Sequence, residues 1–321
     1  MKILLTGAAG FIGSNLAERL CGRGDSVTGF DNFDPFYARE VKERNLAGLL
    51  ARKDFRLVEG DLTDPHDVDQ AFEVAGQVDT VVHLAALAGV RPSIANPGRY
   101  WNVNVTGTMH LLHTCRERGV KRIVFASSSS VYGLDSDVPF SEFDPCGHPM
   151  SPYAATKRAG ELMAFNHHHL YAATVTCLRF FTVYGPRQRP DLAIHKFTRL
   201  IAAGLPIQLF GDGTTSRDYT WIDDILDGVV ASIDQQANDP RTAYRIYNLG
   251  GSRPTSLREL VDRISSALGK QAIIEWKPEE PGDMKHTLAD VNLAQADLGY
   301  APKVSIVAGI PRFVAWFKSG T

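Results

Sequence analysis

The sequence has few cysteines, no large excess of charge of either sign and no long apolar run. Its four cysteines form no CxxC pair, which argues against a zinc site or a disulfide framework and favours a reducing, cytoplasmic setting. With 34 basic and 36 acidic residues, the formal net charge is -2, so we expect no nucleic-acid partner and no membrane-binding surface. Any phosphate group must therefore be bound by local structure.

Two short segments could be mistaken for a targeting segment and for a metal site. The apolar start of the chain reaches Gly7 too early for a signal peptide or a membrane span, so we interpret it as a buried first strand. The three histidines at 167–169 fall within a helical pattern, where a solvated polar face is the simpler interpretation. We expect no metal site.

Short apolar runs alternate with longer helical patterns through the first half of the chain. The expected strands are residues 2–6, 26–30, 55–59, 80–84, 122–126 and 175–180. The expected helices between them include residues 11–21, 106–118 and 153–171. Such alternation predicts an α/β fold with a Rossmann-type, doubly wound parallel sheet.

Beyond residue 186 the alternation loosens, and proline and glycine become frequent. Helical patterns continue at 194–203 and 256–268, which favours a second, smaller α/β lobe. We expect a dinucleotide-binding domain over residues 1–180, to which a segment at about 220–250 returns, and a lobe over 181–321 that mainly binds substrate.

A glycine-rich loop, TGAAGFIG, follows the first expected strand and opens a helix. Gly7, Gly10 and Gly13 allow a tight turn, a close approach of backbone N–H groups to a pyrophosphate, and close helix packing. The helix N-terminus adds partial positive charge. The loop predicts a dinucleotide site, with an ordinary glycine turn as the alternative.

Acidic and small residues follow the next strands. Asp31 stands eighteen positions after Gly13, close to the spacing of a carboxylate that binds ribose hydroxyls. An anion there would repel a 2′-phosphate, which favours NAD over NADP. Residues 61–62 are expected beside the adenine, and the small residues 85–86 leave room for ribose and phosphate; ordinary loop chemistry is the alternative for both.

Tyr153 and Lys157 form a YxxxK pair, one helical turn apart on the same face. A phenol with its ordinary pKa of about 10 is a poor base at neutral pH, but a neighbouring ammonium and a cationic nicotinamide both stabilise the phenolate and lower that pKa. Tyr153 could then accept a hydroxyl proton. Taken alone, such a pair is also explained by packing and solvation on an amphipathic helix.

The fifth expected strand runs into a serine cluster, ASSSSVYG, and the sixth into RFFTVYGP at 179–186. Together with the glycine loop, Asp31 and the YxxxK pair, these segments resemble extended short-chain dehydrogenases/reductases, specifically the NAD-dependent nucleotide-sugar epimerases and dehydratases. The resemblance covers essentially the whole chain. It implies a homodimer paired through the two helices that begin near Thr106 and Tyr153.

The resemblance implies a triad of Ser128, Tyr153 and Lys157. Tyr153 would exchange the proton, Ser128 would hydrogen-bond the same sugar oxygen, and Lys157 would bind the nicotinamide ribose. Asn104 matches an asparagine that supports the cofactor, with helix capping as the alternative. The residues expected at the cofactor are Gly7, Gly10, Phe11, Ile12, Gly13, Asp31, Asn32, Asp61, Leu62, Leu84, Ala85, Ala86, Asn104, Tyr153, Lys157 and Phe180.

Oxidation at C4 of a hexose gives a 4-keto sugar, and the neighbouring acids and bases determine its fate. Dehydratases and decarboxylases of this family carry an acidic residue just before the VYG turn, where this sequence has Ser129 and Ser130. Return of the hydride to the opposite face of C4 needs only the triad and NAD. The expected reaction is 4-epimerisation.

Four segments resemble UDP-glucuronate 4-epimerases: the serine run at 127–130, Thr182 within 179–186, the RPD of 189–191 and the AGVR of 88–91. Oxidised glucuronate is a β-keto acid that readily loses CO₂, so its carboxylate must be held in an unreactive orientation. Hydroxyl groups can do so without protonating it, and an arginine can add a charge-assisted contact. The expected sugar contacts are Ala88, Arg91, Ser129, Ser130, Thr182 and Arg189; for Arg189, diphosphate binding or a surface salt bridge is equally open.

Further resemblances concern the nucleotide and the choice of sugar. Arg217 matches an arginine that clamps the UDP diphosphate, and Asp283 matches a carboxylate near the uridine ribose. Thr287 stands where some relatives have a bulky residue beside the sugar, which keeps UDP-glucose and UDP-N-acetylglucosamine open as substrates. A protein of another class, a non-catalytic NAD-binding sensor, also remains open.

Overall fold

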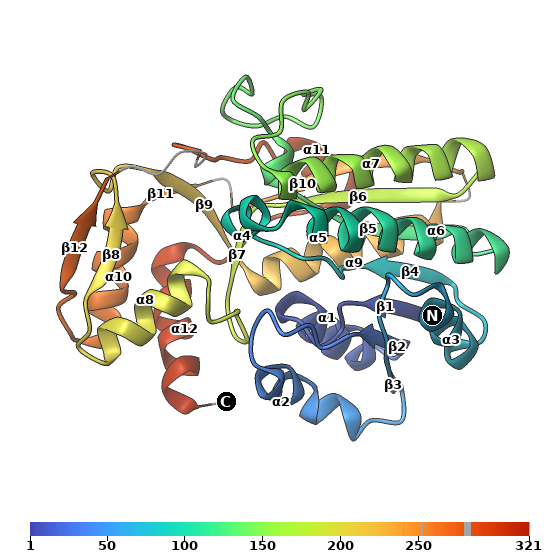
Figure 1. Ribbon diagram of the computed structural model, residues 1–321, viewed down its shortest axis with the longest axis horizontal. Helices are drawn as coiled ribbons and strands as arrows, with labels where there is room; N and C mark the ends of the chain where they lie inside the picture. Colours follow the sequence, from blue (N-terminus) through green and yellow to red (C-terminus); the bar gives the residue numbers. More distant parts are fainter. Residues whose placement is uncertain (240, 252, 279–283, 321) are drawn as a thin grey trace.

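The computed structural model describes residues 1–239, 241–251, 253–278 and 284–320. A seven-stranded sheet, with the strand order β10-β6-β5-β4-β1-β2-β3, forms its centre (Figure 1). Its strands are β1 (Lys2–Thr6), β2 (Ser26–Asp31), β3 (Phe55–Glu59), β4 (Thr80–His83), β5 (Arg122–Ser128), β6 (Thr174–Phe180) and β10 (Tyr244–Leu249). Every pairing in this sheet is parallel, which confirms the predicted doubly wound α/β fold.

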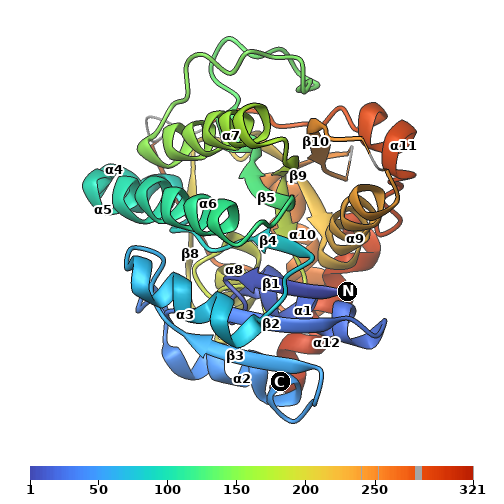
Figure 2. The ribbon, with the colours of Figure 1, turned by 90° about the vertical axis from the view of Figure 1, so that its right-hand side faces the viewer.

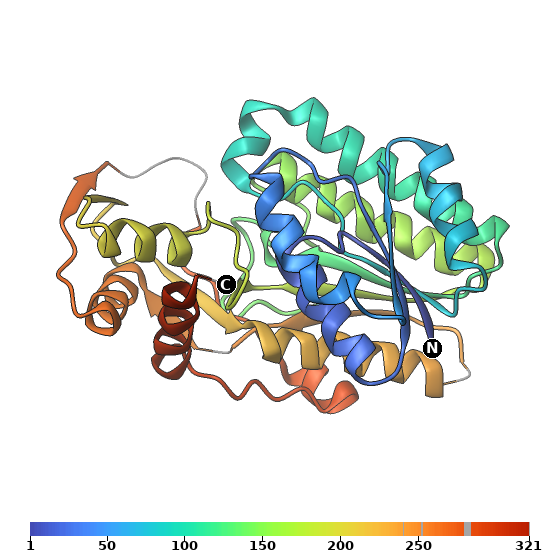
Figure 3. The same cartoon turned by 90° about the horizontal axis from the view of Figure 1, so that it is seen from below.

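Helices cover both faces of this sheet (Figure 3). One face carries α1 (Phe11–Gly22), α2 (Arg39–Leu50) and α9 (Ile222–Asn238), and the other carries α3 (Pro65–Ala75), α6 (Gly107–Glu117) and α7 (Pro152–Tyr171). Each helix turns an apolar stripe to the sheet, so two separate apolar clusters form, one on each face. Burial on both faces explains why most strands are almost entirely apolar runs.

The second lobe lies beside the carboxyl edge of the sheet, on the left in Figure 1. Its small sheets are β11-β9-β7 and β12-β8. They consist of β7 (Thr182–Tyr184), β8 (Ile207–Phe210), β9 (Ser216–Trp221), β11 (Pro254–Ser256) and β12 (Ile274–Lys277). The helices that follow β7 in the chain, apart from α9, are α8 (Ala193–Ala202), α10 (Leu257–Leu268), α11 (Asn292–Leu298) and α12 (Ile306–Ser319).

Strand β10 was not among the strands expected individually. It lies at the edge of the sheet, where it pairs with β6 only. Its sequence, YRIYNL, carries Arg245 and Asn248, so it lacks the continuous apolar run by which the other strands were recognised. In the part of the chain that the structure describes, no helix has the length and apolarity to cross a membrane.

Candidate active site

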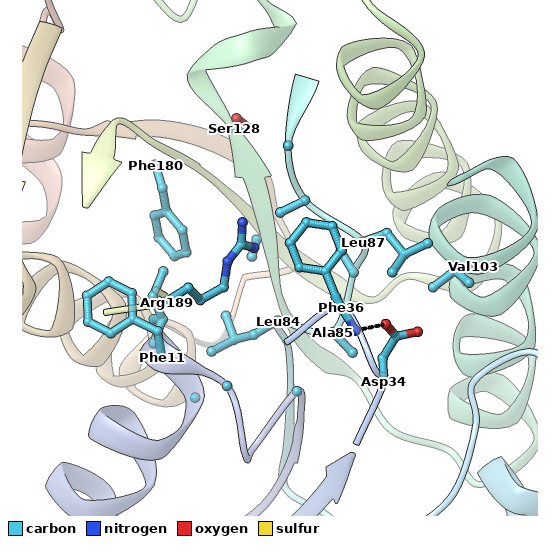
Figure 4. A pocket seen from close by; sticks show the side chains of 18 of the residues that line it. Phe11, Asp34, Phe36, Leu84, Ala85, Leu87, Val103, Ser128, Phe180 and Arg189 are labelled. Atoms are coloured by element: carbon cyan, nitrogen blue, oxygen red, sulfur yellow. Dashed lines mark hydrogen bonds between the residues drawn. The ribbon is translucent and has the colours of Figure 1, made fainter. Parts of the chain in front are cut away.

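The main pocket opens at the carboxyl ends of the central strands, where the chain order reverses between β1 and β4 (Figure 4). Ligands of doubly wound sheets bind at such a switch point. Most of the residues expected from the sequence line this pocket. They are Gly7, Gly10, Phe11, Ile12, Gly13, Asp31, Asn32, Asp61, Leu62, Leu84, Ala85, Ala86, Ala88, Ser128, Ser129, Ser130, Tyr153, Lys157, Phe180, Thr182 and Arg189.

The glycine loop between β1 and α1 leaves space that a side chain would fill. Gly7 has φ +73°, and a Cβ there would lie 2.8 Å from the backbone nitrogen of Ala85. A Cβ on Gly13 would lie 2.0 Å from the carbonyl oxygen of Gly7. Only glycine permits this backbone, and the N-terminus of α1 adjoins it with no acidic residue in its first turn. The loop therefore fits a bound pyrophosphate.

The carboxylate of Asp31 lies at the end of β2, where it is held by backbone groups. It accepts hydrogen bonds from the backbone N–H of Ala9, at 3.0 Å, and of Phe33, at 2.8 Å. Asn32 donates its side-chain amide to Asp61 at 2.8 Å, which joins the ends of β2 and β3. This edge presents fixed acceptors to a ribose.

Several pocket residues were missed by sequence reasoning. Lys42, on α2, is buried, and its Nζ lies 3.5 Å from Oδ1 of Asp31. Asp31 is therefore a paired carboxylate rather than a lone anion. Phe36 and Tyr37, in the loop after β2, also line the pocket. None of these three belongs to a recognisable motif, and Lys42 lies in a polar helical stretch that is typical of a solvent-exposed surface.

The triad residues come from two elements. Ser128 ends β5, and Tyr153 and Lys157 lie in the first two turns of α7. This helix begins where Ser151 accepts a hydrogen bond from the backbone N–H of Ala154, at 3.1 Å, and continues with a proline at its first position. Lys157 lies one helical turn after Tyr153, and its Nζ donates to the carbonyl oxygen of Ala126 at 2.8 Å.

Burial shifts both titrating groups of this pair. It raises the pKa of the Tyr153 phenol, although a hydrogen bond from Ser128 and the charge of Arg189 act in the opposite direction. It lowers the pKa of Lys157 to about 8, with the charge of Glu161 acting against the shift. Among the protein groups, burial therefore has the largest effect on the pKa of Tyr153.

One side of the pocket is lined by hydroxyl groups. Ser129 and Ser130 follow Ser128, and Thr182 begins β7. Arg189 reaches the same pocket, but its guanidinium binds both carboxylate oxygens of Asp191, at 3.0 and 2.8 Å. It also lies 5.0 Å from the ring centre of Phe36, toward which it points in Figure 4.

Three other expected residues that the structure describes, Arg91, Arg217 and Thr287, do not line this pocket. Arg91, on α4 (Val90–Ala95), lies over the ring of Phe210 at 4.7 Å. Arg217, on β9, donates to the carbonyl oxygen of Ser216 at 3.0 Å. Asp283 lies outside the described residues. Thr287 is buried, and its hydroxyl accepts from the backbone N–H of Asp218, at 3.2 Å.

Asn104 is another expected residue outside the pocket lining, and it lies directly behind that lining. It occupies a π-helical turn, η1 (Asn102–Thr106), so it is not a helix cap. Its side chain accepts from the backbone N–H of Leu87, at 2.8 Å, and donates to the carbonyl oxygen of Leu87 and to Thr156. Asn104 thus ties the loop after β4 to α7.

The glycine cradle, the Asp31 edge and the triad together define the site of a dinucleotide-dependent enzyme. The sequence model of the NAD dependent epimerase/dehydratase family matches residues 3–250, and the chain belongs to that family. Within it, the chain is 39% identical over 331 residues to a probable UDP-glucuronate 4-epimerase of Rhizobium meliloti, covering 99% of this chain and 97% of the relative. It is 40% identical over 316 residues to the UDP-glucuronate 4-epimerase of Thermodesulfobacterium geofontis, covering 98% and 95%.

Comparison with solved structures gives the same result as comparison with these sequences. The UDP-glucuronic acid 4-epimerase of Bacillus cereus, in complex with UDP-glucuronic acid and NAD, superposes with a TM-score of 0.92 at 34% identity, covering 100% of both chains. The UDP-glucose 4-epimerase of Thermus thermophilus, in complex with NAD, has a TM-score of 0.86 at 31% identity, again over 100% of both. The resemblance stated from the sequence is confirmed.

No cluster of histidine, cysteine and acidic side chains that could hold a metal ion occurs among the described residues.

Proposed function

We propose that this chain is an NAD-dependent isomerase that converts UDP-glucuronate to UDP-galacturonate. The observation that carries the proposal is the meeting of Ser128 and Tyr153 with a wall of hydroxyl groups in one pocket, next to a dinucleotide cradle. The similarity to UDP-glucuronate 4-epimerases over nearly the whole chain supports it.

A bound NAD would supply the hydride acceptor and donor for oxidation and reduction at C4 of the sugar. Tyr153 accepts the proton of the C4 hydroxyl and gives it back, while Ser128 hydrogen-bonds the same oxygen. The Lys157 ammonium, with its pKa of about 8, is mostly charged at neutral pH and stabilises the phenolate one turn away.

The cofactor would lie along the carboxyl edge of the sheet. Gly7 and Gly13 would hold the pyrophosphate against the N-terminus of α1, and Asp31 with Lys42 would bind the adenosine ribose. We assign cofactor binding to residues 1–180 with a returning segment at about 220–250, and sugar binding mainly to 181–321. Arg217 and Asp283 stay assigned to the UDP moiety by resemblance.

The distribution of charge in the pocket supports epimerisation over elimination. The carboxylates among its described lining residues, Asp31, Asp34 and Asp61, lie at or just beyond the ends of β2 and β3, at the cofactor end. The sugar end offers hydroxyls, and Arg189 is already neutralised by Asp191. A substrate carboxylate can there be bound by neutral donors, which orient it without protonating it.

Epimerisation of UDP-glucose or UDP-N-acetylglucosamine is the second candidate, supported by the similarity to a UDP-glucose 4-epimerase. The deciding experiment incubates the purified protein, without added NAD, with each of the three UDP-sugars and follows the products by NMR. We expect selective formation of UDP-galacturonate without release of CO₂. Turnover of uncharged sugars only would disprove the proposed substrate.

The protein is further proposed to act as a cytoplasmic homodimer, in keeping with its four free cysteines. Helices α6 and α7 lie side by side, as Figure 2 shows, and carry the exposed apolar side chains Met109, Leu162, Phe165 and Leu170. Such a surface fits a two-fold contact with a second copy. Light scattering should give twice the chain mass, and Phe165→Asp should give the monomer.

A further inference from the structure

A buried ion pair lies beneath the serine run at 127–130, which we call the serine edge. Glu161, on α7, and Arg179, on β6, have exposed side-chain fractions of 0% and 1%. Arg179 donates from Nε to Glu161 Oε1 at 2.8 Å and from Nη2 to Oε2 at 2.9 Å, and Arg158, on α7, also donates to Oε2 at 2.9 Å from the partly exposed side. Neither residue lines the pocket, so neither is placed to touch substrate.

One arm of this pair joins the serine edge to the catalytic helix. Ser127 Oγ donates to Glu161 Oε1 at 2.6 Å, and Lys157 Nζ donates to the carbonyl oxygen of Ala126 at 2.8 Å. Two successive residues of β5 are thus bound to two successive turns of α7, immediately before Ser128. Because Tyr153 lies one turn before Lys157, these bonds set its position relative to Ser128.

The other arm holds the turn that carries Ser129 and Ser130. Tyr132 directly follows this turn, and its hydroxyl accepts from Arg179 Nη1 at 3.0 Å. The same hydroxyl donates to Asn248 Oδ1, on β10, at 2.7 Å. The Tyr132 ring stacks on Phe140 at 4.5 Å. Tyr132 is therefore anchored through its hydroxyl and through its ring.

A buried ion pair is seldom the most stabilising way to fill a core. The cost of removing two charges from water often exceeds their attraction, and apolar replacements of similar volume are often neutral or stabilising. The stability of the fold alone therefore does not explain why Glu161 and Arg179 occupy this buried position. The bidentate geometry and the two arms fix orientation instead, and both arms lead to the serine edge.

We propose that Arg179, acting through Glu161 and Tyr132, is a positioning residue that holds the serine edge so that its hydroxyls keep the sugar carboxylate in an unreactive orientation. The inference rests on the proposed function. In the oxidised sugar, a misoriented carboxylate leaves as CO₂: the C5–C6 bond breaks, its electrons pass toward the C4 carbonyl as an enolate, and C5 takes up a proton from water. Loosening the serine edge should increase this side reaction.

Tyr132→Phe is the informative variant, because it removes one hydroxyl and keeps the ring that stacks on Phe140. Its matched control is Tyr247→Phe: Tyr247, on β10, is also buried, and its hydroxyl donates to Asp297 at 2.8 Å, away from the pocket. Two quantities are measured. The first is the amount of CO₂ released per UDP-galacturonate formed when the enzyme turns over UDP-glucuronate. The second is the amide hydrogen exchange of residues 128–133 in the absence of substrate. The first is a ratio, so loss of folded protein does not change it.

Tyr132→Phe removes both hydrogen bonds of this hydroxyl, and we expect the ratio of CO₂ to epimer to rise about tenfold, together with faster exchange at 128–133. Tyr247→Phe should match the wild type in both. Arg179→Lys, which keeps the charge but loses the bidentate contact, should have the larger effect. If that variant does not fold, Tyr132→Phe still decides.

Unchanged exchange in Tyr132→Phe would overturn the inference. Faster exchange without more CO₂ would also overturn it, because the network would then serve stability only. If the wild type does not turn over UDP-glucuronate at all, the proposed function is wrong, and the assignment of the serine edge to a sugar carboxylate fails with it; the exchange result then shows separately whether the network positions this edge.

Discussion

The two ends of the pocket are built in different ways. At the cofactor end, the shape comes from the backbone: the positive φ of Gly7, the missing side chain of Gly13 and the amides that bind Asp31 all lie within one β-α-β unit. At the sugar end, side chains converge from separate segments, with Ser130 after β5, Thr182 at β7 and Arg189 beyond it. A backbone cradle is set by local sequence, whereas a wall of side chains depends on tertiary packing.

The two ends also differ in charge. The cofactor end holds three carboxylates and the buried ammonium of Lys42, whereas the sugar end has hydroxyl groups and an arginine bound to Asp191. Fixed charges suit a resident cofactor whose hydroxyls and phosphates stay in one place. Neutral donors suit a sugar that must turn over during the reaction.

The largest expected effect is on the rate of epimerisation and comes from Tyr153, between the two ends of the pocket. Tyr153→Phe should lower the rate of epimerisation about 1,000-fold, because the phenol is the group that we assign to accept the hydroxyl proton, while UDP-sugar affinity stays near that of the wild type. Rates by NMR and affinity by calorimetry test this. Tyr171→Phe, on the same helix but outside the pocket, is the control. A wild type that binds nucleotide without turnover would instead indicate a sensor.

A substitution in the backbone cradle should affect the cofactor alone. Gly13→Ala places a methyl group 2.0 Å from the carbonyl oxygen of Gly7, so the turn must open, and we expect NAD affinity to fall about 100-fold. Gly22→Ala, at the other end of α1, has no atom within 4 Å of the new methyl and should retain NAD. NAD content after purification is the measurement. Equal content in both variants would contradict the role of the cradle.

Burial of the charged Lys157 should lower the free energy of unfolding, although the proposed mechanism requires this residue. Its pKa is lowered from 10.5 to about 8, so below pH 8 the folded state holds a buried charge, and stability rises as the pH increases from about 8 to 10.5. Lys157→Met should therefore be inactive but raise the free energy of unfolding by about 2 kcal/mol at pH 7.

Urea denaturation at pH 7 and pH 10 tests the direction of this change in the free energy of unfolding. The advantage of Lys157→Met should shrink at the higher pH, where the wild-type lysine no longer carries a full charge. A variant that is less stable than the wild type at pH 7 would mean that the bond from Lys157 to the carbonyl oxygen of Ala126 outweighs the cost of burial.

The smallest expected effect is on the hydroxyl wall. Thr182→Val removes one donor without changing volume, and we expect the Kd of UDP-glucuronate to rise about tenfold while that of UDP-glucose is unchanged. Thr220→Val, buried outside the pocket on β9, is the control. An equal loss for both sugars would show that Thr182 shapes the pocket rather than binding the carboxylate.

Prediction from sequence succeeded where the signal was local. The expected strand 2–6 is β1, and the expected helix 153–171 begins only one residue later than α7. Short apolar runs and an amphipathic period reflect burial directly. Strand β10 was missed as an individual element, since an edge strand with polar residues carries no such pattern. Arg91 and Arg217, taken from resemblance, do not line the pocket.

The sequence by itself determined the glycine turn and the Tyr153–Lys157 pair, because each depends on residues within a few positions of one another. It determined the parallel sheet through the alternation of strand and helix patterns along the chain. Only the tertiary structure decided that Lys42 lies beside Asp31, that Arg189 is bound to Asp191, and that Arg179 and Glu161 lie beneath the serine edge. Side-chain partners from different strands and helices are chosen by packing, and a sequence pattern contains no record of which buried charges will face each other.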